Sequence, residues 1–181
     1  MSSHHVHRIV NGKWKQNCYV ISAPNNEALV IDPGDEADRI ADYLDQQGLS
    51  LLAILVTHGH YDHTGAIPGM KERLGVPWFI HSSEKSTLKQ ANLIRKVFDS
   101  SEPIVLPEPD GYFDQMDSPL NFGAFNIDVH ETPGHTVGGV SFLLDDLLFT
   151  GDTLFKRAIG RVDLPGGDKQ AIRASLSHLS G

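Results

Sequence analysis

The stretch THGHYDH at residues 57–63 places four ligand-type side chains directly after an apolar run. Residues 51–57 have the length and apolar character of a strand that is buried on both faces. His58 and His60 are two residues apart, so on an extended chain their side chains point to the same side. The glycine between them allows a tight turn, and the aspartate and last histidine follow where the chain can enter a helix. The four side chains are therefore expected to converge at the end of a buried strand.

This pattern of side chains predicts a metal site, because imidazole nitrogens and carboxylate oxygens suit zinc, iron or manganese. The alternative is a group of surface histidines, or an aspartate that caps a helix beside uninvolved histidines. The metal site is favoured because polar side chains at the tip of a core strand require partners. Cys18 is the only cysteine, so neither an internal disulfide nor a cysteine-based zinc site is expected.

Two later turns carry the same kinds of side chain after predicted strands. His135 lies in Thr-Pro-Gly-His-Thr at residues 132–136, and Asp152 lies in Thr-Gly-Asp-Thr at residues 150–153. Taken alone, a histidine in a turn is usually exposed, and a Gly-Asp pair is usually only a turn. Because all three segments follow strands, together they predict one shared metal-binding pocket.

Short strands and helices alternate along the chain without an internal repeat or a linker. Apolar and alternating runs predict strands at residues 8–10, 18–22, 28–32, 51–57, 77–81, 122–125, 127–132, 140–144 and 147–150. Helical spacing predicts helices at residues 36–47, 66–74, 84–98 and 169–179, and residues 101–111 are expected to form a loop. Several adjacent strands are predicted to form hairpins. We therefore expect a single α/β (α+β) domain over residues 1–181, with mixed sheets covered by helices.

The composition is that of a globular, acidic domain. Hydrophobic residues make up 40% and charged residues 21% of the chain, which argues against disorder. The formal net charge of −8 disfavours general binding to nucleic acid or to an anionic membrane. No apolar run approaches the roughly 20 residues of a membrane-spanning helix, and the polar start lacks the hydrophobic region of a secretion signal. A cytoplasmic protein that acts on a small molecule is expected.

Taken together, the motifs resemble those of the metallo-β-lactamase-fold hydrolases, and most closely the small glyoxalase II-like (hydroxyacylglutathione hydrolase-like) group. The family pattern T-H-x-H-x-D-H, P-G-H-T and G-D-T-L-F occurs here at residues 57–63, 133–136 and 151–155. The resemblance implies a four-layer αββα sandwich with a two-metal site at one edge of the sheets. By position, it implies that His58, His60 and His135 bind the first ion, that Asp62 and His63 bind the second, and that Asp152 bridges both.

The resemblance also implies a thioester hydrolase with a substrate such as an S-acylglutathione. Two divalent cations, zinc in the first place and otherwise iron or manganese, would hold a hydroxide that attacks the carbonyl, and their charge would stabilise the oxyanion. Asp62 is the implied catalytic residue, which orients the nucleophile or accepts its proton. No protein nucleophile is needed, so Cys18 receives no catalytic role.

The end of the sequence departs from the family pattern. The family supplies a further histidine to the second metal from a Gly-His-Gly turn after the last helix, and this chain reaches Gly181 without one. His178 lies within the predicted last helix and is not taken as a substitute. Three explanations stay open: a truncated chain, a weak second site, or a single metal. The helical domain with which larger glyoxalase II enzymes contact glutathione is also missing, so glutathione specificity is not predicted.

Arg161 is the candidate substrate-binding residue. It lies in Gly-Arg-Val-Asp at residues 160–163, and its guanidinium can hold a substrate carboxylate through two hydrogen bonds. An internal salt bridge with Asp163 is the alternative. The same segment resembles persulfide dioxygenases of this fold, whose single iron would be held here by His58, His135 and Asp152. A mono-iron persulfide dioxygenase and a catalytically weak metal-binding protein are therefore alternative functions.

The remaining histidines receive no catalytic role. A solvated terminus is expected for His4, His5 and His7, a structural role for His81, and a place within a strand for His130. The apolar residues of the helix at residues 84–98 are expected to pack in the core. A nuclease is disfavoured by the negative charge, and a β-lactamase by the lack of a secretion signal.

Overall fold

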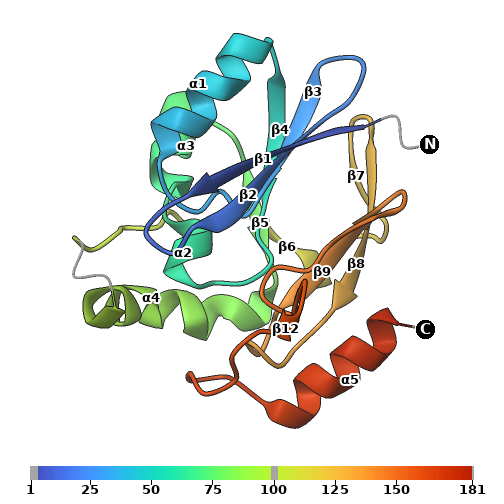
Figure 1. The fold of residues 1–181 in the computed structure, drawn as a ribbon. Helices are drawn as coiled ribbons and strands as arrows, with labels where there is room; N and C mark the ends of the chain where they lie inside the picture. Colours follow the sequence, from blue (N-terminus) through green and yellow to red (C-terminus); the bar gives the residue numbers. More distant parts are fainter. Residues whose placement is uncertain (1–3, 99–101, 181) are drawn as a thin grey trace.

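The computed structural model describes residues 4–98 and 102–180, which form two facing β-sheets with helices on their outer sides (Figure 1). The helices α1 (Ala37–Gln47) and α3 (Ile67–Leu74) lie on the outer side of the larger sheet. On the opposite side, α5 (Lys169–Leu179) lies beside the smaller sheet. This arrangement of layers confirms the predicted αββα sandwich.

The larger sheet has six strands in the order β1-β2-β3-β4-β5-β6. Its strands are β1 (His5–Asn11), β2 (Gln16–Ser22), β3 (Glu27–Ile31), β4 (Ser50–Leu55), β5 (Trp78–Ile80) and β6 (Gly111–Tyr112). The first three strands pair antiparallel, and the pairs from β3 to β6 are parallel. Helix α1 lies in the crossover from β3 to β4, and α3 lies in the crossover from β4 to β5, as parallel neighbours require.

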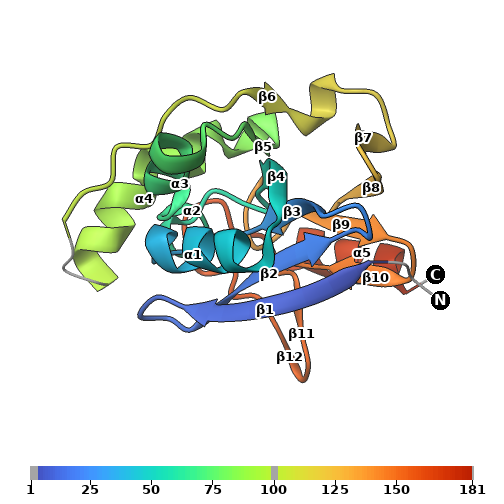
Figure 2. The ribbon, with the colours of Figure 1, turned by 90° about the horizontal axis from the view of Figure 1, so that it is seen from above.

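The smaller sheet is antiparallel, with the order β10-β9-β8-β7. Its strands are β7 (Leu120–Phe122), β8 (Phe125–Glu131), β9 (Val140–Leu144) and β10 (Leu147–Phe149). A separate hairpin of β11 (Leu154–Phe155) and β12 (Ala158–Ile159) projects away from both sheets (Figure 2).

Neighbouring residues of the central strands belong to different apolar layers. Val20 packs beneath the helices with Ile40, whereas the next residue, Ile21, packs between the sheets with Phe142. This alternation is expected of strands that are covered on both faces. The ends of these strands are therefore firmly placed, and the loops that follow them carry the candidate site.

The predicted strand at residues 122–125 is wrong. β7 ends at Phe122 and β8 begins at Phe125, and these two residues are partners across a tight turn. Gly123 in the turn has a φ of 56°, which glycine adopts without steric cost. Because a phenylalanine stands at each end of this turn, residues 122–125 have the apolar pattern of a single strand.

The long helix α4 (Lys85–Phe98) follows a 3₁₀ turn at Ser82–Glu84. Leu93 and Val97 are 66% and 68% exposed, so the prediction that the apolar residues of this helix pack in the core is wrong for them. The physical reason is that α4 packs against α2 (Tyr61–Thr64), so only a narrow stripe of its surface is covered. No helix within the described residues is long and apolar enough to cross a membrane.

Of the first histidines, His5 is exposed, as expected for a solvated terminus, whereas His4 and His7 are partly buried, so the expectation is wrong for these two. β1 begins at His5 and pairs along its length with β2. The ring of His4 stacks on Phe125 with 5.0 Å between centroids, and the ring of His7 stacks on Tyr43 at 4.1 Å. These ring contacts account for the partial burial of His4 and His7.

Candidate metal centre

The loop after β4 carries its histidines from the core to the edge of the sheets. β4 ends at Leu55, and the short helix α2 begins at Tyr61. The side chains of His58, His60 and His63 are all buried, with residue exposures of 2–4%. The structure therefore places these imidazoles together at the end of a buried strand, as predicted.

Three imidazoles from two separate loops form the first cluster. His58 Nε2 lies 3.1 Å from His60 Nδ1, and His135 Nε2 lies 3.0 Å from the same atom. His135 comes from the turn between β8 and β9, 75 residues after His60. One ligand nitrogen from each of the three rings lies within 4.8 Å of the others, so the three could share one cation.

A second cluster adjoins the first and contains a carboxylate. His58, His63 and Asp152 each offer one ligand atom to it, and these atoms lie within 4.8 Å of one another. Asp152 Oδ1 lies 3.3 Å from His63 Nε2, while its Oδ2 lies 3.4 Å from His135 Nε2. Asp152 therefore lies between His63 of the second cluster and His135 of the first, within reach of both.

Asp62 lies farther out than the other candidate ligands. Its Oδ2 is 3.9 Å from His63 Nε2, and its side chain is 26% exposed. Burial raises the pKa of Asp62 above its usual value. This carboxyl group thus lies beside the second cluster, next to the cavities that reach the centre.

The protonation states of the first cluster fit metal binding. Burial, together with the neighbouring imidazoles, lowers the pKa of His60 to about 3 and the pKa of His58 well below its usual range. Both rings are therefore neutral near pH 7, and a neutral ring has the lone pair that a cation needs. Burial acts in the same direction on His63, but Asp32 and Asp152 outweigh it and raise the pKa of His63. The donor set as a whole fits divalent cations.

Asp32 is a residue of the site that the sequence interpretation missed. Its carboxylate accepts hydrogen bonds from the main-chain nitrogen and the hydroxyl of Thr57, both at 2.7 Å, and its Oδ2 lies 3.0 Å from His63 Nδ1. Asp32 is buried, and its φ of 49° is uncommon for a residue other than glycine. Asp32 immediately follows β3, and Asp152 comes three residues after the end of β10, so the strand-end rule that found Asp152 would also have found Asp32.

Glu84 was missed as well, and no sequence signal marks it. It is fully buried, and its two carboxylate oxygens accept hydrogen bonds from the main-chain nitrogens of Gly59 and Gly138, each at 2.7 Å. Gly59 lies between His58 and His60, and Gly138 follows the turn that carries His135. One side chain therefore joins the two loops that supply the first cluster.

The turn of His135 is fixed on its other side by α5 and by a backbone contact. His135 Nδ1 lies 2.7 Å from the carbonyl oxygen of Arg161, which leaves Nε2 to face the cluster. The carbonyl oxygen of Pro133 accepts a hydrogen bond from the Ser175 hydroxyl at 2.7 Å. Gly134 packs so closely on α5 that a Cβ there would lie 2.2 Å from the Ile172 nitrogen.

The Arg161 side chain forms the internal salt bridge that was the alternative to substrate binding. Its Nε and Nη2 each donate to one carboxylate oxygen of Asp163 at 2.8 Å. The guanidinium also lies 5.7 Å from the centre of the Phe98 ring. Arg161 lines a cavity at the centre, but a substrate carboxylate would have to displace Asp163 to be held by the same two nitrogens.

The remaining histidines lie outside the two clusters. His81 is buried, with its Nε2 at 3.6 Å from Glu131 and 3.9 Å from Asp114. His130 lies within β8, as predicted, and its ring contacts His178 on α5. None of these three imidazoles belongs to a group of potential metal ligands within the described residues.

Two cavities open on the metal centre, and Asp62 and Asp152 line both. One has a volume of about 180 Å³ and also reaches His60 and His135. The other has a volume of about 580 Å³ and reaches His63.

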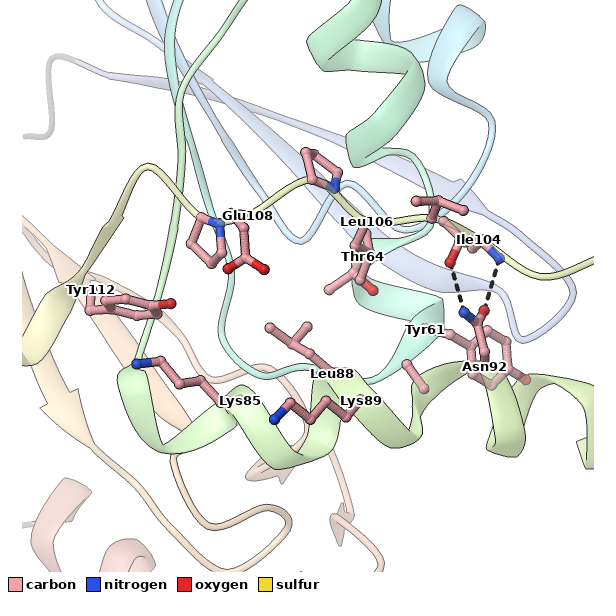
Figure 3. Close-up of a pocket in the computed structure, with 14 residues that line it drawn as sticks. Tyr61, Thr64, Lys85, Leu88, Lys89, Asn92, Ile104, Leu106, Glu108 and Tyr112 are labelled. Carbon is pink, nitrogen blue, oxygen red and sulfur yellow. Dashed lines mark hydrogen bonds between the residues drawn. The ribbon is translucent and has the colours of Figure 1, made fainter.

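A further cavity of about 570 Å³ lies between α4 and residues 104–109 (Figure 3). Lys85 and Lys89 line it, and Asn92 holds the main chain of Ile104 by two hydrogen bonds. Because it contains no candidate metal ligand, we do not place the chemistry there.

The chain is similar to known proteins over most of its length. Residues 11–180 match the model of the metallo-beta-lactamase superfamily. The chain is 36% identical to the "Probable metallo-hydrolase YqgX" of Bacillus subtilis, over 93% of this chain and 80% of that protein. It is 35% identical to the "Hydroxyacylglutathione hydrolase GloC" of Haemophilus influenzae, over 90% of this chain and 78% of that protein.

Solved structures resemble the whole of the described fold. The BLEG-1 B3 metallo-beta-lactamase superposes with a TM-score of 0.88 at 34% identity, over 96% of this chain and 84% of that one. TTHA1623, solved in a di-iron-bound form, superposes with a TM-score of 0.81 at 32% identity, over 96% of this chain and 85% of that one. A similar fold is thus found with iron bound and in a lactamase, so the fold alone does not fix the metal or the substrate.

Proposed function

Because this chain belongs to the metallo-β-lactamase superfamily, we propose that it is a metal-dependent hydrolase that cleaves thioesters such as an S-acylglutathione. The observation that carries the proposal is the convergence of His58, His60 and His135 beside His63 and Asp152. The similarity to a hydroxyacylglutathione hydrolase favours thioesters over other acyl compounds.

Two cations are proposed, with zinc as the first candidate and iron supported by the di-iron neighbour. His58, His60 and His135 would hold the first, Asp62 and His63 would hold the second, and Asp152 lies within reach of both. When bound, such cations supply Lewis acidity and lower the pKa of water, so that a nucleophile is available near neutral pH. The residues of this chain contribute the rest. His58 and His60 are held neutral by burial, and Asp32 orients His63 through its Nδ1.

The reaction needs no protein nucleophile. The oxygen of a water molecule bonds to the acyl carbon, the C–S bond breaks, and the products are a carboxylate, a thiol and one released proton. We assign the transfer of the water proton to Asp62, which lies at the centre and has its pKa raised by burial. Cys18 is fully buried in the apolar layer beneath the helices and takes no part.

The test is hydrolysis of S-acylglutathiones by the metal-loaded protein, measured against the rate with free metal. We expect turnover in the unmodified protein and loss of both metal and turnover in His58→Ala and Asp152→Ala. His130→Ala, which removes an imidazole from β8, is the matched control and should retain both. If no thioester is cleaved faster than by free metal, thioester hydrolysis is excluded.

A mono-iron persulfide dioxygenase is a second candidate. It is favoured by the contact between His135 and Asp152 at 3.4 Å, with His58 adjoining both. The iron-bound neighbour adds support for iron. Oxygen consumption by iron-loaded protein with glutathione persulfide would select this candidate. If the metal-loaded protein shows no turnover in either assay, a catalytically weak metal-binding protein is the alternative that remains.

A further inference from the structure

Apolar side chains surround the smaller of the two cavities at the metal centre. Trp14, Ile94, Phe98 and Leu164 line it together with the ligand-bearing residues at its base. Trp14 comes from the β1–β2 turn, Ile94 and Phe98 from the end of α4, and Leu164 from the loop before α5. Three segments far apart in the sequence thus bring apolar groups to one opening above the candidate metal ligands.

These apolar groups are held in place by direct contacts. The Trp14 and Phe98 rings meet edge to face, with 6.4 Å between centroids, and Trp14 Nε1 donates a hydrogen bond to the Tyr61 hydroxyl. Lys13 donates a hydrogen bond to the Phe98 carbonyl oxygen at 3.2 Å, which ties the β1–β2 turn to α4. The cavity wall is therefore organised before a ligand arrives, which lowers the entropic cost of binding.

The same apolar groups remain partly open to water. Trp14 is 51% exposed and Phe98 is 38% exposed. Both line the cavity, which also contacts the buried residues His60 and His135. An apolar wall around convergent polar groups is the usual form of a small-molecule site. Among the residues that the structure describes, Arg161 is the one arginine or lysine that lines this cavity, and its Nε and Nη2 already donate to Asp163. The surroundings therefore favour an uncharged, apolar group.

We propose that this cavity is the acyl subsite and that it selects thioesters with an unbranched alkyl acyl chain over those with a short hydroxylated one. The inference rests on the proposed thioester hydrolysis and names the substrate class for it. The cavity volume of about 180 Å³ is roughly six times the ~30 Å³ share of one water molecule, which sets the scale at about six chain atoms. The acyl carbonyl would lie at the base near Asp62 and Asp152, and the alkyl chain would lie against Trp14 and Phe98.

The test is a series of S-acyl-N-acetylcysteamines with acetyl, butyryl, hexanoyl and octanoyl chains, and with 2-hydroxypropionyl. The thiol is the same throughout, so differences in kcat/KM report the acyl subsite. We expect kcat/KM to rise about fourfold for each added CH₂ up to about six carbons and then to level off. Trp14→Ala and Phe98→Ala should lower hexanoyl turnover about tenfold more than they lower acetyl turnover. Leu93→Ala, which removes an exposed α4 side chain that does not line this cavity, is the control and should behave as wild type.

Binding of the product acids separates the two proposals. Calorimetric titration of the metal-loaded protein should show hexanoate binding at least tenfold tighter than acetate, with the difference lost in Phe98→Ala. If hexanoate shows this preference but no thioester is cleaved, the apolar subsite stands and thioester hydrolysis fails. If thioesters are cleaved with a flat chain-length profile, or the hydroxylated chain is preferred, the acyl-subsite proposal is overturned.

Discussion

Glu84 accepts a hydrogen bond from the main-chain nitrogen of Gly59 at 2.7 Å while its side chain is fully enclosed by the protein. Its other oxygen does the same for Gly138 at 2.7 Å. A buried carboxylate is costly unless its oxygens are satisfied, and here both are satisfied by the loops that carry the first histidine cluster. We infer that Glu84 sets the distance between His60 and His135.

Replacing Glu84 by glutamine should weaken metal binding about tenfold. The amide oxygen can accept from one loop, but its NH₂ group then faces the other main-chain N–H and leaves it unsatisfied. Competition with a chromophoric chelator measures the affinity, and far-UV circular dichroism checks that the fold is kept. Glu72→Gln makes the same change at an exposed position of α3 and should have no effect. Equal affinity in Glu84→Gln and wild type would show that this contact does not position the ligands.

Asp32→Asn should weaken binding at the second cluster by about 10- to 100-fold. The carboxylate of Asp32 lies 3.0 Å from His63 Nδ1, and an uncharged amide there would no longer orient and polarise the ring. Titration with Co²⁺, followed by its visible absorption, would show the weaker of two binding steps shift to higher concentration. Asp38→Asn, at a side chain that is 94% exposed, serves as the control. An unchanged titration curve would argue against a role for Asp32 in the metal centre.

The sequence predicted the parts of this site that follow a simple rule. A polar side chain directly after an apolar strand lies at a sheet edge, and this rule located His58, His135 and Asp152. Asp32 obeys the same rule, but Pro33 and Gly34 beside it have the composition of an ordinary turn. Glu84 could not be found in this way, because its partners are main-chain atoms that are distant in sequence.

The fold shows the same division between local and tertiary information. The helix at Lys169–Leu179 has the bounds that its apolar spacing predicts. In contrast, the exposure of Leu93 and Val97 depends on which face of α4 packs against the rest of the protein. The spacing of apolar residues along the helix does not show which face that is. The salt bridge between Arg161 and Asp163 likewise depends on how side chains are placed in the folded chain, which the sequence pattern does not show.

Gly134→Ala should lower the free energy of unfolding by about 1–3 kcal/mol. Gly134 has a φ of 133°, which L-residues rarely adopt, and an added Cβ would lie 2.2 Å from the Ile172 nitrogen in α5. Urea denaturation measures the loss. Gly75→Ala also introduces a side chain at positive φ, but nothing lies within 4 Å of its Cβ, so its loss should be smaller. If the two variants lose equal stability, the close packing of α5 on this turn contributes nothing beyond backbone strain.

The single thiol should be unreactive in the native protein. Cys18 is fully buried, and burial raises its pKa, so almost none of it is the nucleophilic thiolate at pH 8. Ellman's reagent should therefore find no thiol in the native protein and one thiol per chain in guanidinium chloride. Rapid labelling under native conditions would show that the apolar layer beneath the helices is open to solvent.

The central claim is that separate loops deliver imidazoles and a carboxylate to one metal centre, and metal stoichiometry tests it most directly. Metal-free protein is titrated with Zn²⁺ by calorimetry, alongside His60→Ala, His135→Ala, Asp152→Ala and the control His130→Ala. The account predicts tight binding in wild type and in the control. It also predicts that His60→Ala, His135→Ala and Asp152→Ala each lose at least one order of magnitude in metal affinity, although the three substituted residues lie on different segments. Wild-type stoichiometry and affinity in any of those three would contradict it.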